Sequence, residues 1–360
     1  MEFTDIDVEA AFAFEPNPAR IVFGAGRIGS VSDEAMRLGV SNMLVVCSAG
    51  RRKSADRAAT ALGDKCAGVC DAAVTSMSEE AFDAAMAKIK RTGADSILSL
   101  GGGSPLGLGK VVVHETGLPH ISAPTTYSGS ELRGDWRVEI SGGIRNGDDP
   151  DCRPATVIYD PELTIELPPS VSGPSGMNAM AHAVESLYSP AANPVSSAVA
   201  ELGIAALGAS LRAIMQNPTD MAARGLAFRG AWLAGGFRAG SCLKHRMAQT
   251  IRRVHRMTHA QSHAVSLPFV VAFNEPAAPA AMARIKQALG SDGAALGLFA
   301  LNDALGIPTS LAALGMDVAR LDETADLIAE HNISNPRPLT RDDVRTVLDN
   351  AFHGRRVVAT

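Results

Sequence analysis

Aromatic side chains are scarce in this sequence. They make up 4% of its 360 residues, with two Trp and three Tyr, so little is available for stacking a large aromatic ligand. No apolar stretch approaches the roughly 18 uninterrupted residues that a transmembrane helix needs. No block of like charge stands out, and 33 basic against 38 acidic residues leave a net charge of −5. These absences exclude a general nucleic-acid partner and a membrane partner from the expected functions.

Cysteine is also sparse. The chain has five cysteines, an odd number scattered along its length, which argues against a disulfide framework and fits a reducing compartment. Cys66 and Cys70 would share a helix face, but without neighbouring ligands they do not predict a zinc site. The first residues lack the basic-then-apolar order of a secretory signal peptide. We therefore expect a cytoplasmic protein.

The order of predicted elements changes near residue 165. Before it, Ala-rich helical segments alternate with short apolar runs at 20–23, 43–47, 96–100 and 120–123. This alternation is typical of a parallel sheet covered on both faces. A breaker-rich connection at 167–176 follows, and nearly everything beyond it has helical patterning. The sequence thus predicts a Rossmann-like dinucleotide-binding α/β domain at 1–164 and an all-helical substrate and catalytic domain at 165–360.

A glycine-rich loop follows the predicted strand at 96–100. Its residues are Gly101, Gly102, Gly103 and Ser104, and three glycines allow a phosphate to approach the backbone closely. Ser104 is expected to cap the next helix and Pro105 to take its first position. Free N–H groups and the helix dipole at that N-terminus favour pyrophosphate. This loop is the best predicted cofactor site.

A second glycine turn, at 24–29, matches G-x-G-x-x-G. The acidic residue expected about 20 positions later is absent, since Ser48 and two small residues occupy that zone. The motif is therefore either a nucleotide fingerprint or a plain tight turn. The basic residues at 51–53 would lie near an adenosine ribose, where they would accept a 2′-phosphate, or they form a solvated surface turn.

Histidines concentrate in the helical half of the chain. Four of the nine fall between 245 and 263. His182 lies four residues after Asn178 on an earlier helix, with Glu185 one turn further along. Two such helices meeting at a cleft would hold a divalent metal. A lone helical histidine is usually structural, but a cluster of this density favours a functional site.

The helix predicted from residue 243 also carries a polar stripe. His245, Gln249 and Arg252 or Arg253 recur at helical spacing. An arginine in this stripe would bind a carboxylate substrate through two parallel hydrogen bonds, although a solvated basic face is the alternative interpretation. Residues 244–256 include several cations and no acidic residue, which favours an anionic substrate.

These motifs together resemble the iron-containing alcohol dehydrogenase superfamily, and within it the maleylacetate reductases. The shared segments are FGAG at 23–26, GGGSPLGLGK at 101–110, PTTYSGSE at 124–131, ATVIYDPELT at 155–164, SGMNAMAHAVESLY at 175–188 and NPRPLTRDDV at 335–344. They run nearly end to end and in the family's order. The resemblance implies an iron-containing alcohol dehydrogenase / dehydroquinate synthase-like fold, with an N-terminal α/β nucleotide-binding domain, an all-α C-terminal domain and a homodimeric assembly.

The resemblance also implies functional residues. The pyrophosphate of NADH or NADPH would bind at Gly101, Gly102, Gly103 and Ser104, with Thr125, Thr126, Tyr127 and Ser48 also in the cofactor site. The candidate catalytic residues are His182, His245 and His259, which match family positions, together with Gln249, Arg252 and Arg253 of the polar stripe. The superfamily's metal positions match Asn178, His182, His245 and His259. Asn in place of the usual Asp removes a charged ligand, so we expect no bound metal.

Several residues depart from the family pattern around the chemistry. Gln249 stands where a second histidine is usual, so a proton relay at this position is lost. Arg252 and Arg253 replace a Gly-Gly pair. Arg133 lies where a small residue is expected, and an acidic stretch follows at 148–151. The scaffold motifs persist, so the departures concern activity more than fold.

The leading prediction is an NAD(P)H-dependent oxidoreductase of aromatic-compound catabolism, which delivers hydride to an unsaturated oxo-dicarboxylic acid or a related anionic carbonyl compound. Arg252 or Arg253 would bind a carboxylate, and His245 would orient the substrate or supply a proton. The alternative is a diverged homologue with a lyase, isomerase or cyclase activity on an acidic metabolite, which a lack of nicotinamide nucleotide binding would favour. A non-catalytic binding or regulatory dimer is the third possibility.

Overall fold

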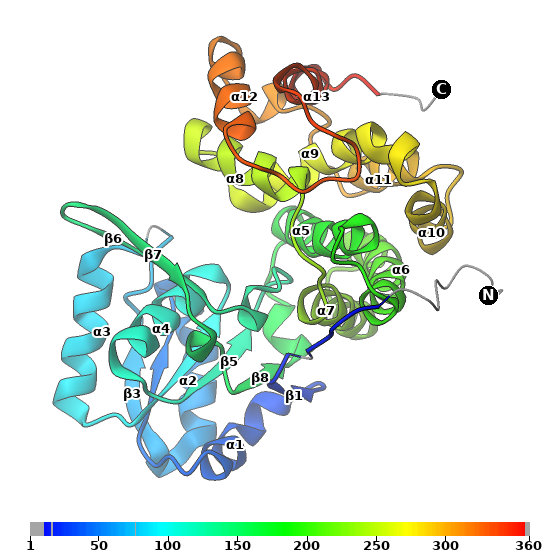
Figure 1. The fold of residues 1–360 in the computed structure, drawn as a ribbon. Coiled ribbons are helices and arrows are strands. Elements are labelled where there is room, and N and C mark those ends of the chain that lie inside the picture. The colour runs from blue at the N-terminus through cyan, green and yellow to red at the C-terminus, as the bar shows by residue number, and fades with distance from the viewer. Residues whose placement is uncertain (1–10, 16, 76, 357–360) are drawn as a thin grey trace. The chain divides into compact units, whose positions relative to one another are not determined.

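The structure, a computed structural model, describes residues 11–15, 17–75 and 77–356 and divides the chain into two compact units (Figure 1). One unit is Asn17–Leu167, and the other contains the chain from Pro168 onward together with the described residues before 16. The domain boundary predicted from the sequence, after residue 164, lies slightly earlier. Residues 11–15 group with the helical unit, where the Phe14 ring stacks on Phe237 with 6.2 Å between ring centroids.

The unit Asn17–Leu167 is built around a six-stranded parallel sheet with the strand order β1-β8-β5-β4-β2-β3. Its strands are β1 (Arg20–Phe23), β2 (Met43–Val46), β3 (Cys66–Cys70), β4 (Ser96–Gly101), β5 (His120–Pro124) and β8 (Thr156–Tyr159). Its helices are α1 (Val31–Arg37), α2 (Arg52–Leu62), α3 (Glu79–Thr92) and α4 (Gly103–Thr116). The predicted parallel sheet is confirmed.

Helices cover both faces of this sheet. Along β2, Val45 packs into the core formed with α1 and α2, whereas Leu44 and Val46 pack into the core formed with α3 and α4. Side chains alternate between the two faces of a strand, so a strand with both faces covered is apolar throughout. A separate antiparallel hairpin, β6 (Asp135–Ile140) and β7 (Gly143–Asp148), packs on α4 through Trp136 and Val138.

A buried carboxylate joins β1 to α1. Glu34, which is 5% exposed, accepts a hydrogen bond from Arg20 Nε at 3.0 Å and another from Arg37 Nε at 3.0 Å. Burial opposes ionisation of Glu34, but the hydrogen bonds and charges of its two arginine partners outweigh burial and lower its pKa. The ionised form is therefore favoured by folding.

Cys66 and Cys70 lie on the strand β3 rather than on a helix, which corrects the helical reading of this segment. Both cysteines are free, and Cys70 packs in the core beneath α3 and α4. Ala-Gly-Val between them supplies too short an apolar run to distinguish strand from helix by its period. The interpretation of these residues as small apolar side chains fits Cys70 best, because Cys66 is only half-buried.

Every secondary-structure element described in the second unit is a helix. Its helices are α5 (Pro169–Tyr188), α6 (Pro194–Gln216), α7 (Met221–Gly236), α8 (Leu243–His255), α9 (His259–Asn274), α10 (Pro279–Leu289), α11 (Ala294–Ala304), α12 (Leu321–Ala329) and α13 (Arg341–His353). By length and composition α6 would suffice to cross a membrane. It packs against α5, α7 and α10, however, as the core helix of a helical domain does.

Most of the breaker-rich segment 167–176 is helical, contrary to the predicted connection, because α5 begins at Pro169 and contains Pro174. Pro169 takes the first helical position, which tolerates proline, whereas Pro174 lies in the second turn and cannot donate the usual hydrogen bond to the carbonyl of Ser170. The glycine at 176 allows α6 to approach closely, since a Cβ there would come within 2.5 Å of Leu211 Cδ2. Sequence rules treat such a glycine as a breaker, whereas here it is a packing residue.

Candidate active site

The predicted cofactor loop connects β4 to α4. A Cβ at Gly101, where φ is +147°, would come within 2.5 Å of Pro105 Cγ, and one at Gly102 would come within 2.9 Å of Thr126 Cγ2. Nothing lies within 4 Å of a Cβ built at Gly103, which is exposed. The loop is therefore tightly packed on one side and open at Gly103, where a phosphate could approach the backbone.

The start of α4 differs from the prediction in its capping residue. Gly103 is the first helical residue, and Gly102 rather than Ser104 occupies the N-cap position. Pro105 consequently lies third in the helix instead of first. A glycine cap has no side chain to bind the N–H groups of the first turn, so these donors suit an anionic ligand. Ser104 remains half-exposed beside them.

Thr125 and Thr126 follow β5, which pairs with β4 in parallel. The Thr125 N–H donates to Gly101 O at 3.0 Å and ties the two strand ends together. Thr126 is half-exposed and lies against the glycine loop. Tyr127 is fully buried, and its hydroxyl donates to Thr164 Oγ1 at 3.4 Å. The ring of Tyr127 therefore supports the loop from the interior, while Thr126 lies at the surface that a cofactor would meet.

Ser48 is half-exposed after β2, the strand that pairs with β4 on its other side. It therefore lies at the same carboxyl edge of the sheet as the glycine loop. Of the basic residues at 51–53, Arg52 is the first residue of α2 and pairs with Asp56 at 2.8 Å and with Asp71 at 3.2 Å. A 2′-phosphate at this edge would compete with those carboxylates for the arginine.

The turn at 24–29 binds the carboxylate of Asp160. The backbone N–H groups of Gly26 and Ile28 donate to the two carboxylate oxygens of Asp160, at 3.0 and 2.9 Å. Asp160 is fully buried. The donors that a phosphate would need are already used by the chain, so the structure favours the tight turn over the nucleotide fingerprint.

Histidines from three helices meet in the helical unit. His182 lies on α5, His245 on α8, and His259 and His263 on α9. Ring centroids are 4.3 Å apart for His182 and His245, 5.0 Å for His245 and His263, and 4.2 Å for His259 and His263. His259 is half-buried and the other three are at most 5% exposed. The structure thus brings the three predicted catalytic histidines together and adds His263 to them.

Two buried ionisable side chains hold these rings. Glu185 accepts hydrogen bonds from the Nδ1 of His245 and, at 3.3 Å, from its backbone N–H. The Nζ of Lys244 contacts the Nδ1 of His263. Glu185 and Lys244 are both fully buried. We refer to these two residues together with His182, His245, His259 and His263 as the histidine cluster.

Burial also dominates the titration of the cluster. It raises the pKa of the Glu185 carboxyl, an effect that the charge of Lys244 partly offsets. It lowers the pKa of Lys244 to about 7, although Glu185 acts in the opposite direction. Burial and the neighbouring Lys244 charge together lower the pKa of His263. Lys244, whose pKa is lowered to about 7, can therefore exchange protons during a reaction near pH 7, whereas burial favours the neutral form of His263.

Lys244 is a residue that the sequence patterns did not single out, since they counted it with the basic residues at 244–256. It lies on the apolar stripe of α8, four residues before Ala248 and seven before Ile251, both of which are buried. That spacing is the signal that could have identified it. The basic residues at 244–256 therefore do not share one surface, because Lys244, the first of them, is buried within the histidine cluster.

The remaining predicted residues of α8 are exposed. Gln249, Arg252 and Arg253 lie on the same side of the helix as His245 by helical spacing, yet all three are exposed whereas His245 is 2% exposed. The polar stripe thus runs from a buried histidine to exposed arginines. A ligand bound along this stripe would contact charged arginines at the exposed end of the stripe and the imidazole of His245 at the buried end.

The histidine cluster fits a divalent metal ion poorly. Among the described residues, the single group of three or more His, Cys, Asp or Glu whose ligand atoms lie within 4.8 Å of one another is His114, Asp149 and Cys152, in the other unit. Asn178, the expected fourth ligand, contributes a neutral amide and is buried. Lys244 brings a potential cation into the cluster. Both features oppose the binding of a divalent cation.

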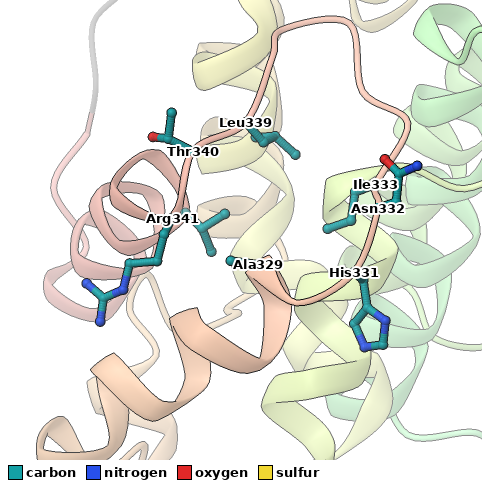
Figure 2. Close-up of a pocket in the computed structure, with 8 residues that line it drawn as sticks. Ala329, His331, Asn332, Ile333, Leu339, Thr340 and Arg341 are labelled. Atoms are coloured by element: carbon teal, nitrogen blue, oxygen red, sulfur yellow. The ribbon is translucent and has the colours of Figure 1, made fainter.

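A pocket of about 240 Å³ lies at the connection between α12 and α13 (Figure 2). It is lined by Ala329, His331, Asn332, Ile333, Leu339, Thr340, Arg341 and Val344. Half of these residues belong to the motif at 335–344, so this motif shapes the helix connection. The predicted site residues are not among those that line it.

Comparison with known proteins identifies the family. The family model described as iron-containing alcohol dehydrogenase matches residues 18–161, and that of the Fe-containing alcohol dehydrogenase family, C-terminal, matches 173–352. A maleylacetate reductase of Burkholderia cepacia is 41% identical over 348 residues, which cover 96% of this chain and 99% of that protein. Another, from Pseudomonas sp. (strain P51), is 38% identical over 95% of this chain and 98% of its own length.

Solved structures agree with these sequence matches. A putative alcohol dehydrogenase from Ralstonia eutropha JMP134 superposes with a TM-score of 0.93 at 41% identity and covers 97% of this chain and 100% of that one. The maleylacetate reductase from Agrobacterium tumefaciens gives a TM-score of 0.92 at 38% identity, with the same coverage. The predicted resemblance, fold class and enzyme class are confirmed. The chain belongs to the iron-containing alcohol dehydrogenase family, in which it is an oxidoreductase that resembles the maleylacetate reductases.

Proposed function

We propose that this enzyme is an NADH- or NADPH-dependent reductase that adds hydride to maleylacetate or a closely related unsaturated oxo-dicarboxylic acid. The observation that carries the proposal is the 38–41% identity to maleylacetate reductases over nearly the whole chain. Such an activity belongs to the catabolism of aromatic compounds. We further propose that the enzyme works in the cytoplasm as a homodimer, for which light scattering of the purified protein is the direct test.

The proposed cofactor site is the glycine loop, with Gly101, Gly102, Gly103 and Ser104 around the pyrophosphate and Thr126 beside it. The open position at Gly103 and the uncapped start of α4 support this assignment. When bound, the reduced nicotinamide supplies the hydride. The loop's part is to fix the position of the dinucleotide, because its backbone donors and the α4 dipole act on the phosphates.

The proposed substrate residues lie on α8. Arg252 and Arg253 are exposed residues, and a guanidinium group suits the carboxylates of a dicarboxylic acid. His245 is the proposed proton donor to the carbon or oxygen that becomes negative after hydride addition. Since Glu185 holds its Nδ1, proton exchange with a substrate would go through Nε2. Glu185 acts as a positioning residue that sets the orientation of the imidazole.

We also propose that the reaction is independent of a metal ion. The charge that a divalent ion would bring to the histidine cluster is supplied in this chain by Lys244, which lies against His263 and interacts with Glu185. Activity should therefore survive dialysis against EDTA unchanged. Replacement of Lys244 by Met keeps the side-chain length but removes the ammonium, and we expect a lower kcat that added Zn²⁺ or Fe²⁺ does not restore. Restoration by either ion would contradict metal independence.

The test of the main proposal is the oxidation of NADH and of NADPH by the purified enzyme with maleylacetate, followed by absorbance. Gly103→Asp places a carboxylate where the pyrophosphate is proposed to bind, so it should raise the KM for the dinucleotide at least tenfold through charge repulsion. Gly103→Ala is the matched control for the loss of glycine. Absence of nucleotide oxidation with maleylacetate and related enoates would refute the proposed reaction, and unchanged dinucleotide affinity in Gly103→Asp would refute the proposed loop.

A further inference from the structure

The nucleotide-binding unit holds a set of potential metal ligands that the proposed reaction does not use. His114 lies in the last turn of α4, Asp149 directly follows β7, and Cys152 ends the short helical turn Pro150–Cys152. Their ligand atoms all lie within 4.8 Å of one another, with His114 Nδ1 and Asp149 Oδ2 3.1 Å apart. Since Gly103 and His114 are eleven residues apart, about 16 Å of helix separates this group from the cofactor loop.

The surrounding chain orients two of the three ligands. The His114 ring stacks on Trp136, with centroids 4.1 Å apart and 25° between the planes. The other oxygen of Asp149, Oδ1, accepts the Asp151 N–H at 3.0 Å, which leaves Oδ2 directed at His114. Hydrogen bonds to the second atom of a ligand and packing of its ring are the features that orient side chains around bound metals.

The backbone also brings these residues together closely. The Asp149 N–H donates to Gly134 O at 3.2 Å, and a Cβ at Gly134 would come within 2.2 Å of Asp149 O. Only a glycine at 134 therefore permits this approach. The Cys152 N–H then donates to Asp149 O at 3.0 Å, which turns the thiol inward to a fully buried position.

The types of ligand indicate the class of ion. Imidazole nitrogen, thiolate sulfur and one carboxylate oxygen suit Zn²⁺ and similar transition metals, whereas Mg²⁺ and Ca²⁺ prefer oxygen alone. Donors on one tetrahedral Zn²⁺ are roughly 3.3–3.8 Å apart, given metal–ligand distances of about 2.0–2.3 Å. The observed spacing needs only small side-chain rotations to reach this geometry. His114 and Asp149 have side chains that are 30% and 34% exposed, so an ion has access from solvent.

We propose that His114, Asp149 and Cys152 form a binding site for Zn²⁺ or a similar transition-metal ion, with water or a further ligand in the fourth position. The ion displaces the thiol proton of Cys152 and the hydrogen bond between His114 and Asp149. Its role is structural, because it joins the end of α4 to the segment that leads from the β6–β7 hairpin into β8. The site is separate from the proposed reductase chemistry, so its loss leaves hydride transfer possible.

The experiment is metal binding to the metal-free full-length protein, with Zn²⁺ measured by equilibrium dialysis and Co²⁺ by absorption spectroscopy. We expect one tightly bound ion per chain, a thiolate-to-cobalt charge-transfer band, and a higher Tm in the presence of Zn²⁺. His114→Gln and Cys152→Ser should each weaken binding more than about tenfold, and Cys152→Ser should abolish the band. His114→Gln changes a partly exposed side chain, so it tests the site even if Cys152→Ser fails to fold.

Matched controls distinguish this site from the histidine cluster. Cys242→Ser removes a buried thiol that interacts with Glu185 of that cluster, and it should leave the cobalt band and the affinity unchanged. His259→Gln should likewise leave metal binding unchanged. The proposal is overturned if the wild-type protein binds no stoichiometric Zn²⁺ or Co²⁺. It is also overturned if binding persists in both His114→Gln and Cys152→Ser, or is lost in His259→Gln.

Discussion

Replacement of Glu185 by Gln tests whether the histidine cluster is held as the structure indicates. Glu185 is fully buried and accepts from both the ring and the backbone N–H of His245. The substitution keeps the shape of the side chain and removes its charge. A hydrogen bond to a charged group contributes about 1.5–3 kcal/mol. If the amide oxygen retains one of the two bonds, we expect a loss of about 2 kcal/mol in the free energy of unfolding.

Two assays measure this effect. For a unit of this size the loss corresponds to a decrease in Tm of about 4–8 °C, which calorimetry resolves. Displacement of the His245 ring should also lower kcat about 10- to 100-fold, with a smaller change in KM. Since Glu185 raises the pKa of Lys244, its loss should lower that pKa further and move the pH dependence of kcat toward acid.

The control for the same chemical change is Glu330→Gln, because Glu330 is exposed at the end of α12. Its Tm and kcat should match those of the wild type, as a surface substitution usually stays within about 0.5 kcal/mol. If Glu185→Gln also melts and reacts like the wild type, then Glu185 does not position His245 and the proposed proton donor loses its support.

Three further predictions concern packing, pH and the substrate. Gly230→Ala should destabilise the protein by about 1–3 kcal/mol, since a Cβ there would come within 2.7 Å of Leu207 Cγ and 3.1 Å of its backbone N. In the control Gly208→Ala, the added Cβ makes ordinary contacts, so the stability should not fall. Chemical denaturation measures the free energy of unfolding of both variants. The pKa of Glu34 is lower in the folded state. The contribution of ionised Glu34 to the free energy of unfolding is therefore complete above the unfolded pKa of about 4.3 and is lost as the pH falls through the folded pKa. Glu34→Gln should reduce the loss of stability at acid pH, which a stability–pH curve measures. Arg253→Ala should raise the KM for a dicarboxylate about 10- to 100-fold through loss of a charge-assisted hydrogen bond, and an unchanged KM in steady-state kinetics would exclude this arginine from substrate binding.

Local patterns sufficed for much of the α/β unit. The apolar run that forms β4 and the three glycines after it predict a strand, a tight turn and a helix, because each depends on neighbouring residues. The capping residue of α4 was wrongly predicted, since Ser104 and Gly102 both suit an N-cap and packing against Thr126 decides between them. The hairpin β6–β7 was not foreseen, because its two strands carry charged residues on a solvent-facing side.

The candidate site was only partly visible in the sequence. The spacing of His182, His245 and His259 indicated a cluster, and the structure brings these rings together. The burial of Lys244 was not recognised, because a lysine between a leucine and a histidine is usually exposed. Its position on the apolar side of α8 places its ammonium within the cluster. This residue changes the expected charge of the site and with it the case for a metal.

The sequence by itself determined the two-part organisation, the parallel sheet, the glycine loop and the family, because these follow from periodicity and from motifs of contiguous residues. The tertiary structure alone decided which polar groups meet across long separations. Asp160 fills the turn at 24–29, and His114 meets Asp149 and Cys152. Such pairings depend on the register and packing of whole elements, which no local pattern encodes. The tertiary structure likewise decided the place of Trp136, one of only two tryptophans in the sequence, which stacks on His114 of the proposed metal site.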